Sequence, residues 1–158
     1  MAVSGMNTIT VNLDKLRKEF GDKPIKKIQE EAGKLIVQSA KAKVPVSTKP
    51  HKRYNTKGKV VATYYPGNLK RSIGIVSFKE KKGKITFVGP RLYKKDSYGD
   101  FKGNKIDGWY GHFMEYGTAQ GQRAQPYMRP AYDETKETVK KKLEQGMQSL
   151  FNGFNPKK

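Results

Sequence analysis

The segment that most restricts the fold is residues 109–118, WYGHFMEYGT, which residues 125–131, QPYMRPA, follow closely. The first part has the aromatic content of a β-strand and ends near a glycine that suits a turn. Pro126 and Pro130 limit the backbone freedom of the following arm, and Pro130 fits the first turn of a helix. This order predicts a strand end and a helix start held at a fixed angle. An assembly module needs such an arrangement, whereas no catalytic chemistry requires it.

The composition predicts one domain with a lean core. A chain of 158 residues can bury a core without cross-links, but only 35% of these residues are hydrophobic. We expect Leu35 and Leu143 in that core. There is no cysteine, so disulfides and thiolate metal sites are excluded, and two histidines make a zinc site an unexpected feature. No apolar run approaches a membrane span, and the first residues lack the pattern of a signal peptide.

The positive charge is concentrated in the middle of the chain. Of the net charge of +19, residues 41–102 contribute +14, from 17 basic and 3 acidic side chains. Clustered positive charge attracts polyanions and acidic protein surfaces, although a solubilising surface without a partner is the alternative. We expect residues 45–68 to form a basic insertion, a loop or a hairpin, with a strand over 59–65. The candidate contacts with DNA or an acidic partner are Lys49, Lys52, Arg53, Lys57, Lys59, Lys81 and Lys82.

Residues 13–44 have the apolar spacing of an N-terminal helical region. A short first stretch ends before Asp22, and a longer helix begins there. Asp22 is suited to be its N-cap and Pro24 to lie in its first turn. The longer helix is expected to end near Lys43, because Pro45 disfavours a helical conformation in the residue before it.

A sheet is predicted over residues 69–118. Its clearest strands are 72–78 and 84–88, which are rich in β-branched and aromatic residues and are joined through a glycine as a hairpin. A long polar loop follows over 91–108, and residues 109–116 form a third strand.

A second long helix is predicted over residues 131–151, with acidic residues near its start and lysines further along. A proline-braced arm over 119–130 leads into it, and residues 152–158 form a flexible tail. Residues 1–158 thus predict a single α+β domain. Its antiparallel sheet of three to five strands carries a long N-terminal helix and a C-terminal helix on one face.

No constellation of catalytic residues stands out, so we expect a protein without enzymatic activity and without a cofactor. His112 and Glu115 lie three apart in the predicted strand and would point to opposite faces. Glu115 is instead suited to cap backbone amides or to pair with an arginine. Asp96, Asp100 and Asp107 do not have the spacing of a calcium loop.

Several tyrosines lie among the basic residues, an arrangement that can stack nucleic-acid bases while neutralising phosphates. The alternative is that tyrosine is favoured in strands and at protein interfaces. The signature of an RNA-recognition sheet is absent, so contact with a DNA backbone is favoured over sequence readout. The tyrosines are Tyr54, Tyr64, Tyr65, Tyr93 and Tyr98.

Four motifs, in order, resemble one family. They are AKVPV at 42–46, GNLKRSI at 67–73, EYGT at 115–118 and QPYMRPAY at 125–132. Together they are similar to the tail-component family of long-tailed bacteriophages, whose members are neck, tail-completion or head–tail joining proteins. The resemblance spans roughly residues 13–145.

The resemblance implies a structural virion protein, made in the cytoplasm of the bacterial host, that forms a ring between capsid connector and tail tube. The ring is usually hexameric and meets adaptor or stopper, tail-terminator and tail-tube proteins. Contact with packaged DNA is a further expectation, and a basic DNA-binding accessory protein is the alternative function. The expected subunit-interface residues are Glu115, Tyr116, Gly117, Thr118, Pro126, Tyr127, Arg129 and Pro130.

Overall fold

The structure is a computed structural model that describes residues 21–80, 83–92, 100–101 and 104–154. The helical stretch expected before Asp22 and the final four residues lie outside this range. The described residues form an α+β fold, as predicted, in which the N-terminal and C-terminal helices pack together. No helix in the described part of the chain combines the length and the apolar character needed to cross a bilayer.

Helix α2 (Asp22–Lys43) begins one residue earlier than a cap at Asp22 requires. Gly21 is the N-cap, and no side chain caps the first turn, so the expected role of Asp22 is wrong. Pro24 lies in the first turn, where its missing N–H costs nothing. The helix ends at Lys43 as predicted, because Val44 is already extended before Pro45, while its N–H still bonds Ala40 O at 2.9 Å.

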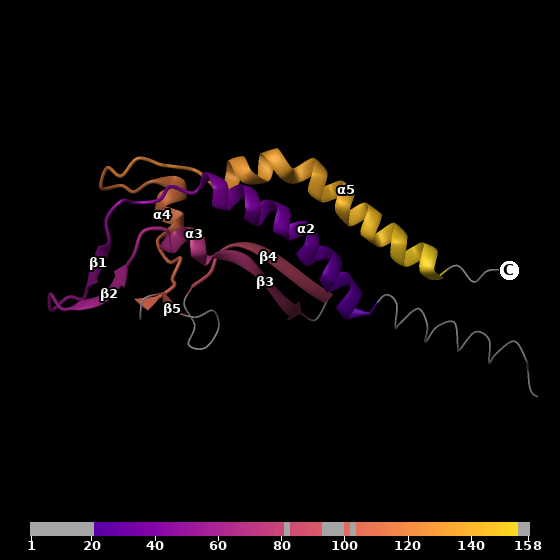
Figure 1. The fold of residues 1–158 in the computed structure, drawn as a ribbon, viewed down its shortest axis with the longest axis horizontal. Helices are drawn as coiled ribbons and strands as arrows, with labels where there is room; N and C mark the ends of the chain where they lie inside the picture. The colour runs from indigo at the N-terminus through magenta and orange to yellow at the C-terminus, as the bar shows by residue number, and fades with distance from the viewer. Residues whose placement is uncertain (1–20, 81–82, 93–99, 102–103, 155–158) are drawn as a thin grey trace, which may run out of the picture.

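Helix α5 (Met128–Phe154) starts three residues before the predicted range and ends three residues after it. It runs alongside α2, as Figure 1 shows, and α2 lies between α5 and the hairpin of β3 and β4. Gly146 permits the close approach, because a Cβ there would stand 2.6 Å from Ile28 Cγ2. At the other end of the contact, Lys43 Nζ lies 2.6 Å from a carboxylate oxygen of Glu134.

Strands β3 (Ile73–Glu80) and β4 (Gly83–Pro90) form the antiparallel hairpin predicted from sequence. The side chains of Ile75 and Val88, which are paired across the hairpin, both lie 3.2 Å from the position of a Cβ on Gly33 of α2. Thr86 Oγ1 also donates to Gln29 Oε1 of α2 at 2.8 Å. One face of the hairpin is therefore covered by α2.

The predicted single sheet of three to five strands is wrong. The described strands pair only two by two, and the other pairs are β1 (His51–Tyr54) with β2 (Val60–Tyr64), and β5 (Asp100–Phe101) with β6 (Asn104–Lys105). The basic insertion is thus a hairpin, which projects at the end of the molecule remote from the C-terminus in Figure 1. A short helix, α3 (Asn68–Ser72), precedes β3.

The third strand predicted over 109–116 is also wrong, because this segment forms helix α4 (Gly111–Tyr116) after a turn. Tyr110 and Met114 pack against the core, and Gly111 and Glu115 are buried. The neighbours Tyr110 and Gly111, and likewise Met114 and Glu115, are thus turned to the same side, which a helix allows and the alternation of a strand does not. Tertiary contact therefore overrides the strand preference of the aromatic residues.

The core is small and lies where α2, α3, β3 and the start of α5 meet. Ile73 and Tyr127 are its largest fully buried side chains, both 0% exposed. Leu35 and Leu143, which the sequence places in the core, are only half-buried. The buried apolar residues of this cluster are Ala40, Val44, Leu69, Ile73, Tyr127 and Ala131.

Candidate functional site

Glu115 fixes the arm to the body of the subunit. Its Oε2 accepts hydrogen bonds from the backbone N–H groups of Tyr127 and Met128, both at 2.8 Å. Its Oε1 accepts from the backbone N–H and from Nε of Arg129, at 3.0 and 3.1 Å. The sequence left open whether Glu115 caps amides or pairs with an arginine, and the structure confirms both.

The position of Glu115 suits its charge. The first amides of a helix lack partners within the helix and carry partial positive charge, and Glu115 faces those of α5. Burial by itself would raise the pKa of Glu115, but the amides of Met128, Tyr127 and Arg129, together with the Arg129 side chain, hold this pKa below its usual value. The carboxylate is therefore charged at neutral pH and acts as the N-terminal cap of α5.

The arm between α4 and α5 folds back on its own subunit. Gln125 N donates to Met114 O at 2.7 Å, and Thr118 N donates to Gln122 O at 3.0 Å. These two bonds close the arm into a compact loop beside α4. The backbone hydrogen bonds of the arm are therefore made within its own chain.

The eight predicted interface residues divide into two groups. Glu115 and Tyr127 are buried and make their contacts within their own chain. Tyr116 is 68% exposed, and the guanidinium of Arg129 lies over its ring, 5.0 Å from the centroid. The other members of the outer group are Gly117, Thr118, Pro126 and Pro130, which are half-buried or exposed.

Gly117 ends α4 in a conformation that other residues rarely adopt, with φ at +76°. A Cβ at this position would also lie 2.6 Å from Gln122 O. We expect Gly117→Ala to lower the free energy of unfolding by about 2–3 kcal/mol, of which about 1 kcal/mol is the backbone term. Chemical denaturation measures it. Gly58→Ala is the matched control, because Gly58 has φ +73° and nothing within 4 Å of its Cβ position. Equal losses in both variants would contradict the packing of the arm described here.

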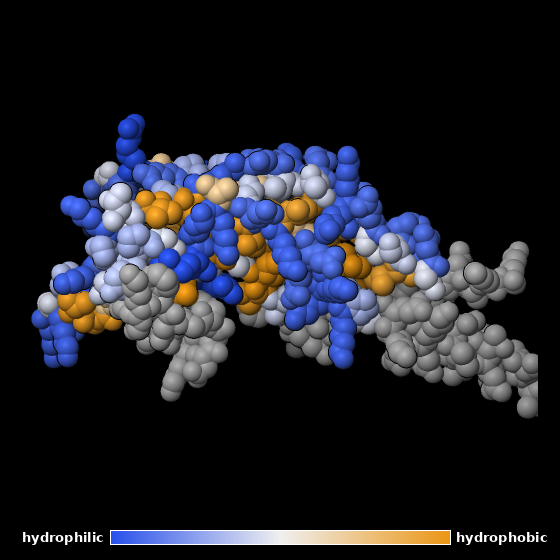
Figure 2. Space-filling model, in the orientation of Figure 1, coloured by the Kyte–Doolittle hydropathy of each residue, from blue (hydrophilic) through white to orange (hydrophobic). Residues whose placement is uncertain are grey.

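The second face of the β3–β4 hairpin is apolar and partly exposed. Val76 pairs with Phe87 on this face, and Phe87 is 55% exposed, with Ile85 38% exposed beside it. Phe87 also lines a groove of about 530 Å³ with Ile36 and Tyr132, at the junction of β4, α2 and α5. Figure 2 shows apolar surface, in orange, as several patches divided by hydrophilic side chains on one side of the molecule.

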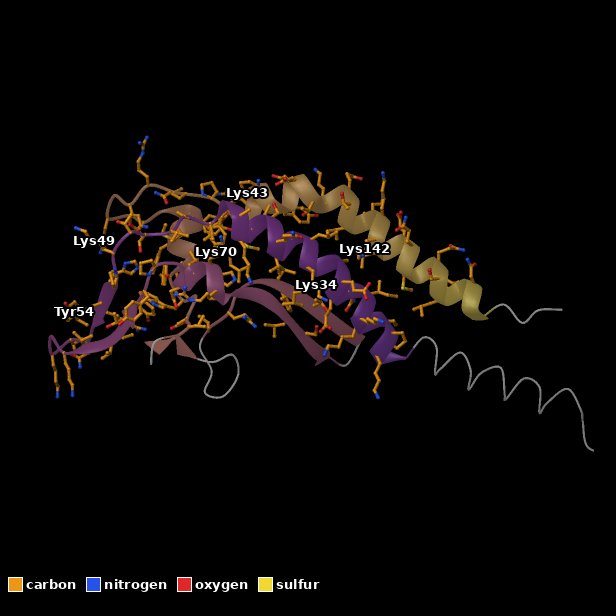
Figure 3. All side chains as sticks on the ribbon, in the orientation of Figure 1. Lys34, Lys43, Lys49, Tyr54, Lys70 and Lys142 are labelled. Atoms are coloured by element: carbon orange, nitrogen blue, oxygen red, sulfur yellow. The ribbon has the colours of Figure 1, made fainter. Side chains whose placement is uncertain are left out.

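The basic hairpin of β1 and β2 presents its cations to solvent. All of β1 is exposed, and the turn that follows is fixed by Asn55, whose Oδ1 accepts from the N–H groups of Lys57 and Lys59. Figure 3 shows Tyr54 and Lys49 at this projecting end of the molecule. Among the predicted DNA or acidic-partner contacts, Lys49, Lys52, Arg53, Lys57 and Lys59 are exposed here, whereas Lys81 and Lys82 lie outside the described residues.

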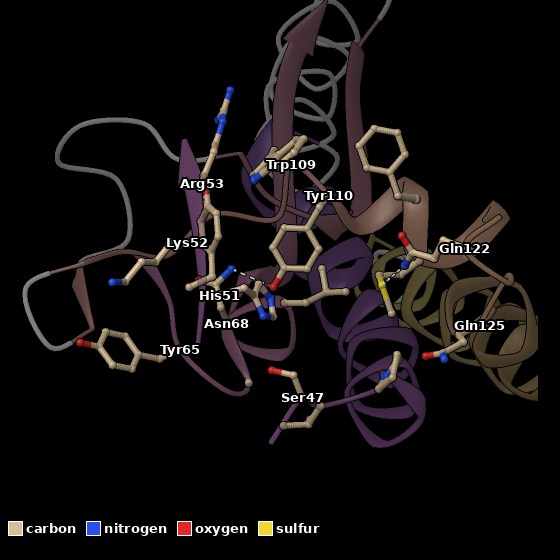
Figure 4. Close-up of a pocket in the computed structure, with 17 residues that line it drawn as sticks. Ser47, His51, Lys52, Arg53, Tyr65, Asn68, Trp109, Tyr110, Gln122 and Gln125 are labelled. Carbon is tan, nitrogen blue, oxygen red and sulfur yellow. Dashed lines mark hydrogen bonds between the residues drawn. The ribbon is translucent and has the colours of Figure 1, made fainter. Parts of the chain in front are cut away.

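A cleft of about 670 Å³ lies between this hairpin, α3 and α4 (Figure 4). Trp109 and Tyr110 form one wall, and the Arg53 guanidinium lies over the Trp109 ring, 4.6 Å from its centroid. Asn68 Nδ2 donates to the Tyr110 hydroxyl at 3.2 Å, and burial raises the pKa of this hydroxyl, so it is neutral at physiological pH. Tyr64 completes the wall, with its ring centroid 5.5 Å from that of Tyr110.

Sequence reasoning missed this cleft, because its walls come from segments far apart in the chain. The available signal is the pair Trp109 and Tyr110, which the strand predicted over 109–116 includes. His112, which was expected opposite Glu115 on a strand, is exposed on α4, with Nδ1 3.0 Å from Trp109 O. Among the described residues, no three histidine, aspartate or glutamate side chains lie close enough together to hold a metal ion.

No family model, no curated protein and no solved structure matches this chain. The resemblance to phage tail components therefore remains an expectation from the four sequence motifs.

Proposed function

We propose that this chain is a structural virion protein of the phage neck or tail terminus. In this proposal, copies of the chain form a closed ring that joins the capsid connector to the tail tube. The observation that carries the proposal is the β3–β4 hairpin, whose two faces are both apolar while only one is covered by α2. The four sequence motifs, which resemble those of phage tail components, favour the neck or tail terminus as the place of this ring.

A two-stranded sheet is marginally stable alone, and its unpaired edges can accept further strands. No other described strand pairs with β3 or β4. The exposed side chains of Ile85 and Phe87 need a surface to bury against, and a neighbouring subunit supplies one. A ring in which each copy meets the next in the same way buries this face in every copy.

The charge distribution favours the same surface for contact between copies. A chain with net charge +19 repels its own copies, so they can meet only where the local charge is balanced. The groove beside Phe87 is lined by one cation, Arg129, and one anion, Asp133. The hairpin of β1 and β2 carries cations alone and is unsuited to this contact.

Mass spectrometry of purified particles tests the proposal. We expect a fixed number of copies per particle, equal to the number of subunits in the ring or a multiple of that number. Six is the number that the resemblance implies. Absence of the chain from the particles contradicts the proposal.

Phe87→Glu should prevent assembly while leaving the subunit folded. Burying a carboxylate at this position against a neighbouring copy is costly, because no opposite charge pairs with it there. We therefore expect incorporation into particles to fall about tenfold or more. The unfolding free energy of the isolated chain should change by less than about 1 kcal/mol, since Phe87 is largely exposed. Val61→Glu, at an exposed position on β2, is the control and should assemble normally. Normal incorporation of Phe87→Glu would show that this face is not an interface.

A role as a DNA-binding accessory protein is the second candidate, and the exposed hairpin favours it. Residues 45–68 carry five basic and no acidic side chains. Replacing Lys57 and Lys59 by alanine should reduce the slope of log affinity against log salt by about 1.8 if both contact DNA phosphates. Fluorescence anisotropy with a labelled duplex measures this slope. Replacing Lys140 and Lys141 on α5 is the matched control, and equal slopes for both double variants would contradict a DNA role of the hairpin.

A further inference from the structure

We propose that the cleft between β1, α3 and α4 binds an acidic peptide segment of a partner protein, with a carboxylate of that segment paired to Arg53. The cleft shares no lining residue with the groove beside Phe87, so this proposal does not depend on the ring.

The charge of the cleft selects an anion. Lys52 and Arg53 line it beside His51, and no aspartate or glutamate is among its lining residues. The surrounding hairpin adds further cations and no acids. A second copy of this chain is a poor occupant, because the net charge of +19 opposes its approach to a basic cleft. An acidic segment of another protein has the complementary charge.

The ring faces of Trp109 and Tyr64 offer little room for stacking, which favours a peptide over a nucleic-acid base. Arg53 lies over the Trp109 ring, which stands nearly perpendicular to the rings of Tyr110 and Phe113, at interplanar angles of 76° and 86°. Tyr64 is only 4% exposed, so its face is closed to a ligand. A base binds by stacking on an open ring face.

The size and the polar groups of the cleft also suit a peptide. Its volume of about 670 Å³ holds several side chains. Ser47, Gln122 and Gln125 lie at its margin and can both donate to and accept from a peptide backbone. The indole N–H of Trp109 is buried and has no acceptor among the described residues.

The test uses the full chain and a fluorescein-labelled peptide of alternating glutamate and proline, at about 0.15 M salt. Anisotropy measures binding. Trp109 emission reports on the cleft itself, because this is the sole tryptophan of the chain. We expect saturable binding with a change in Trp109 emission. A peptide with glutamine in place of glutamate should bind about tenfold more weakly or not at all.

Two variants locate the site. Arg53→Ala should weaken binding of the glutamate peptide about tenfold, whereas Lys140→Ala removes the same charge from the exposed side of α5 and should not. Circular dichroism checks that both variants are folded. Equal weakening by the two variants, or an unchanged Trp109 emission, overturns the proposal. Tighter binding of single-stranded oligothymidine, lost in Arg53→Ala, would assign the cleft to nucleic acid and overturn it as well.

Discussion

Glu115→Gln should lower the free energy of unfolding by about 3–5 kcal/mol, the largest effect that we expect from a single polar substitution. Each carboxylate oxygen accepts two hydrogen bonds, one pair at the amides of Tyr127 and Met128 and the other at Arg129. A glutamine has one oxygen, so its NH₂ group would face two N–H donors and leave them unpaired. Chemical denaturation of the isolated chain measures the loss.

Glu137→Gln is the matched control, because Glu137 is exposed on the same helix that Glu115 caps. It should change the stability by less than about 0.5 kcal/mol. Equal stabilities of the wild type and Glu115→Gln would show that the cap contributes nothing to holding the arm.

The same carboxylate makes the fold sensitive to acid. Its pKa is lower in the folded chain than the ordinary value of a glutamate, which applies when the chain is unfolded. Its contribution to stability is therefore complete above that ordinary value and is lost as the pH falls through the lower, folded value. The stability difference between wild type and Glu115→Gln should shrink on acidification. The pKa of Glu134 is also lowered, first by its hydrogen bond with Lys43 and next by that with Ser39. Because Glu134 is present in both proteins, its contribution cancels in the stability difference between them.

Tyr127→Ala should cost about 3–5 kcal/mol, because it removes the largest fully buried side chain from a small core. Its ring fills the space between α2, α3 and the start of α5, and its hydroxyl donates to Gly111 O at 3.4 Å. Thermal and chemical denaturation measure the change. Tyr54→Ala is the control, because Tyr54 is 58% exposed on β1 and should cost less than about 0.5 kcal/mol. Leu35→Ala should fall between the two, since Leu35 is half-buried. A loss at Tyr54 as large as that at Tyr127 would contradict the core described here.

The sequence predicted correctly those helix ends and strands that depend on neighbouring residues alone. Pro45 ended α2 and Pro130 marked the first turn of α5, because proline constrains the backbone whatever its surroundings. The β3–β4 hairpin followed from β-branched residues on either side of a short turn. These features depend on residues adjacent in sequence.

The errors lie where distant residues decide the local structure. The aromatic run at 109–116 has strand composition, yet it forms α4 because Tyr110 and Met114 pack on a core built by α2 and α5. The role of Glu115 as a cap could be anticipated, but its partners lie twelve and more residues away. The basic residues near Arg53 were expected to contact a partner, whereas the cleft beside them depends on the placement of Trp109. Spacing in the sequence cannot supply such distances.

Electron cryo-microscopy of purified particles shows whether a neighbouring copy covers the second face of the β3–β4 hairpin, as we propose. We expect a closed ring of this chain at the neck or tail terminus, with Ile85 and Phe87 buried against the adjacent copy. A reconstruction in which both side chains of every copy face solvent would contradict it.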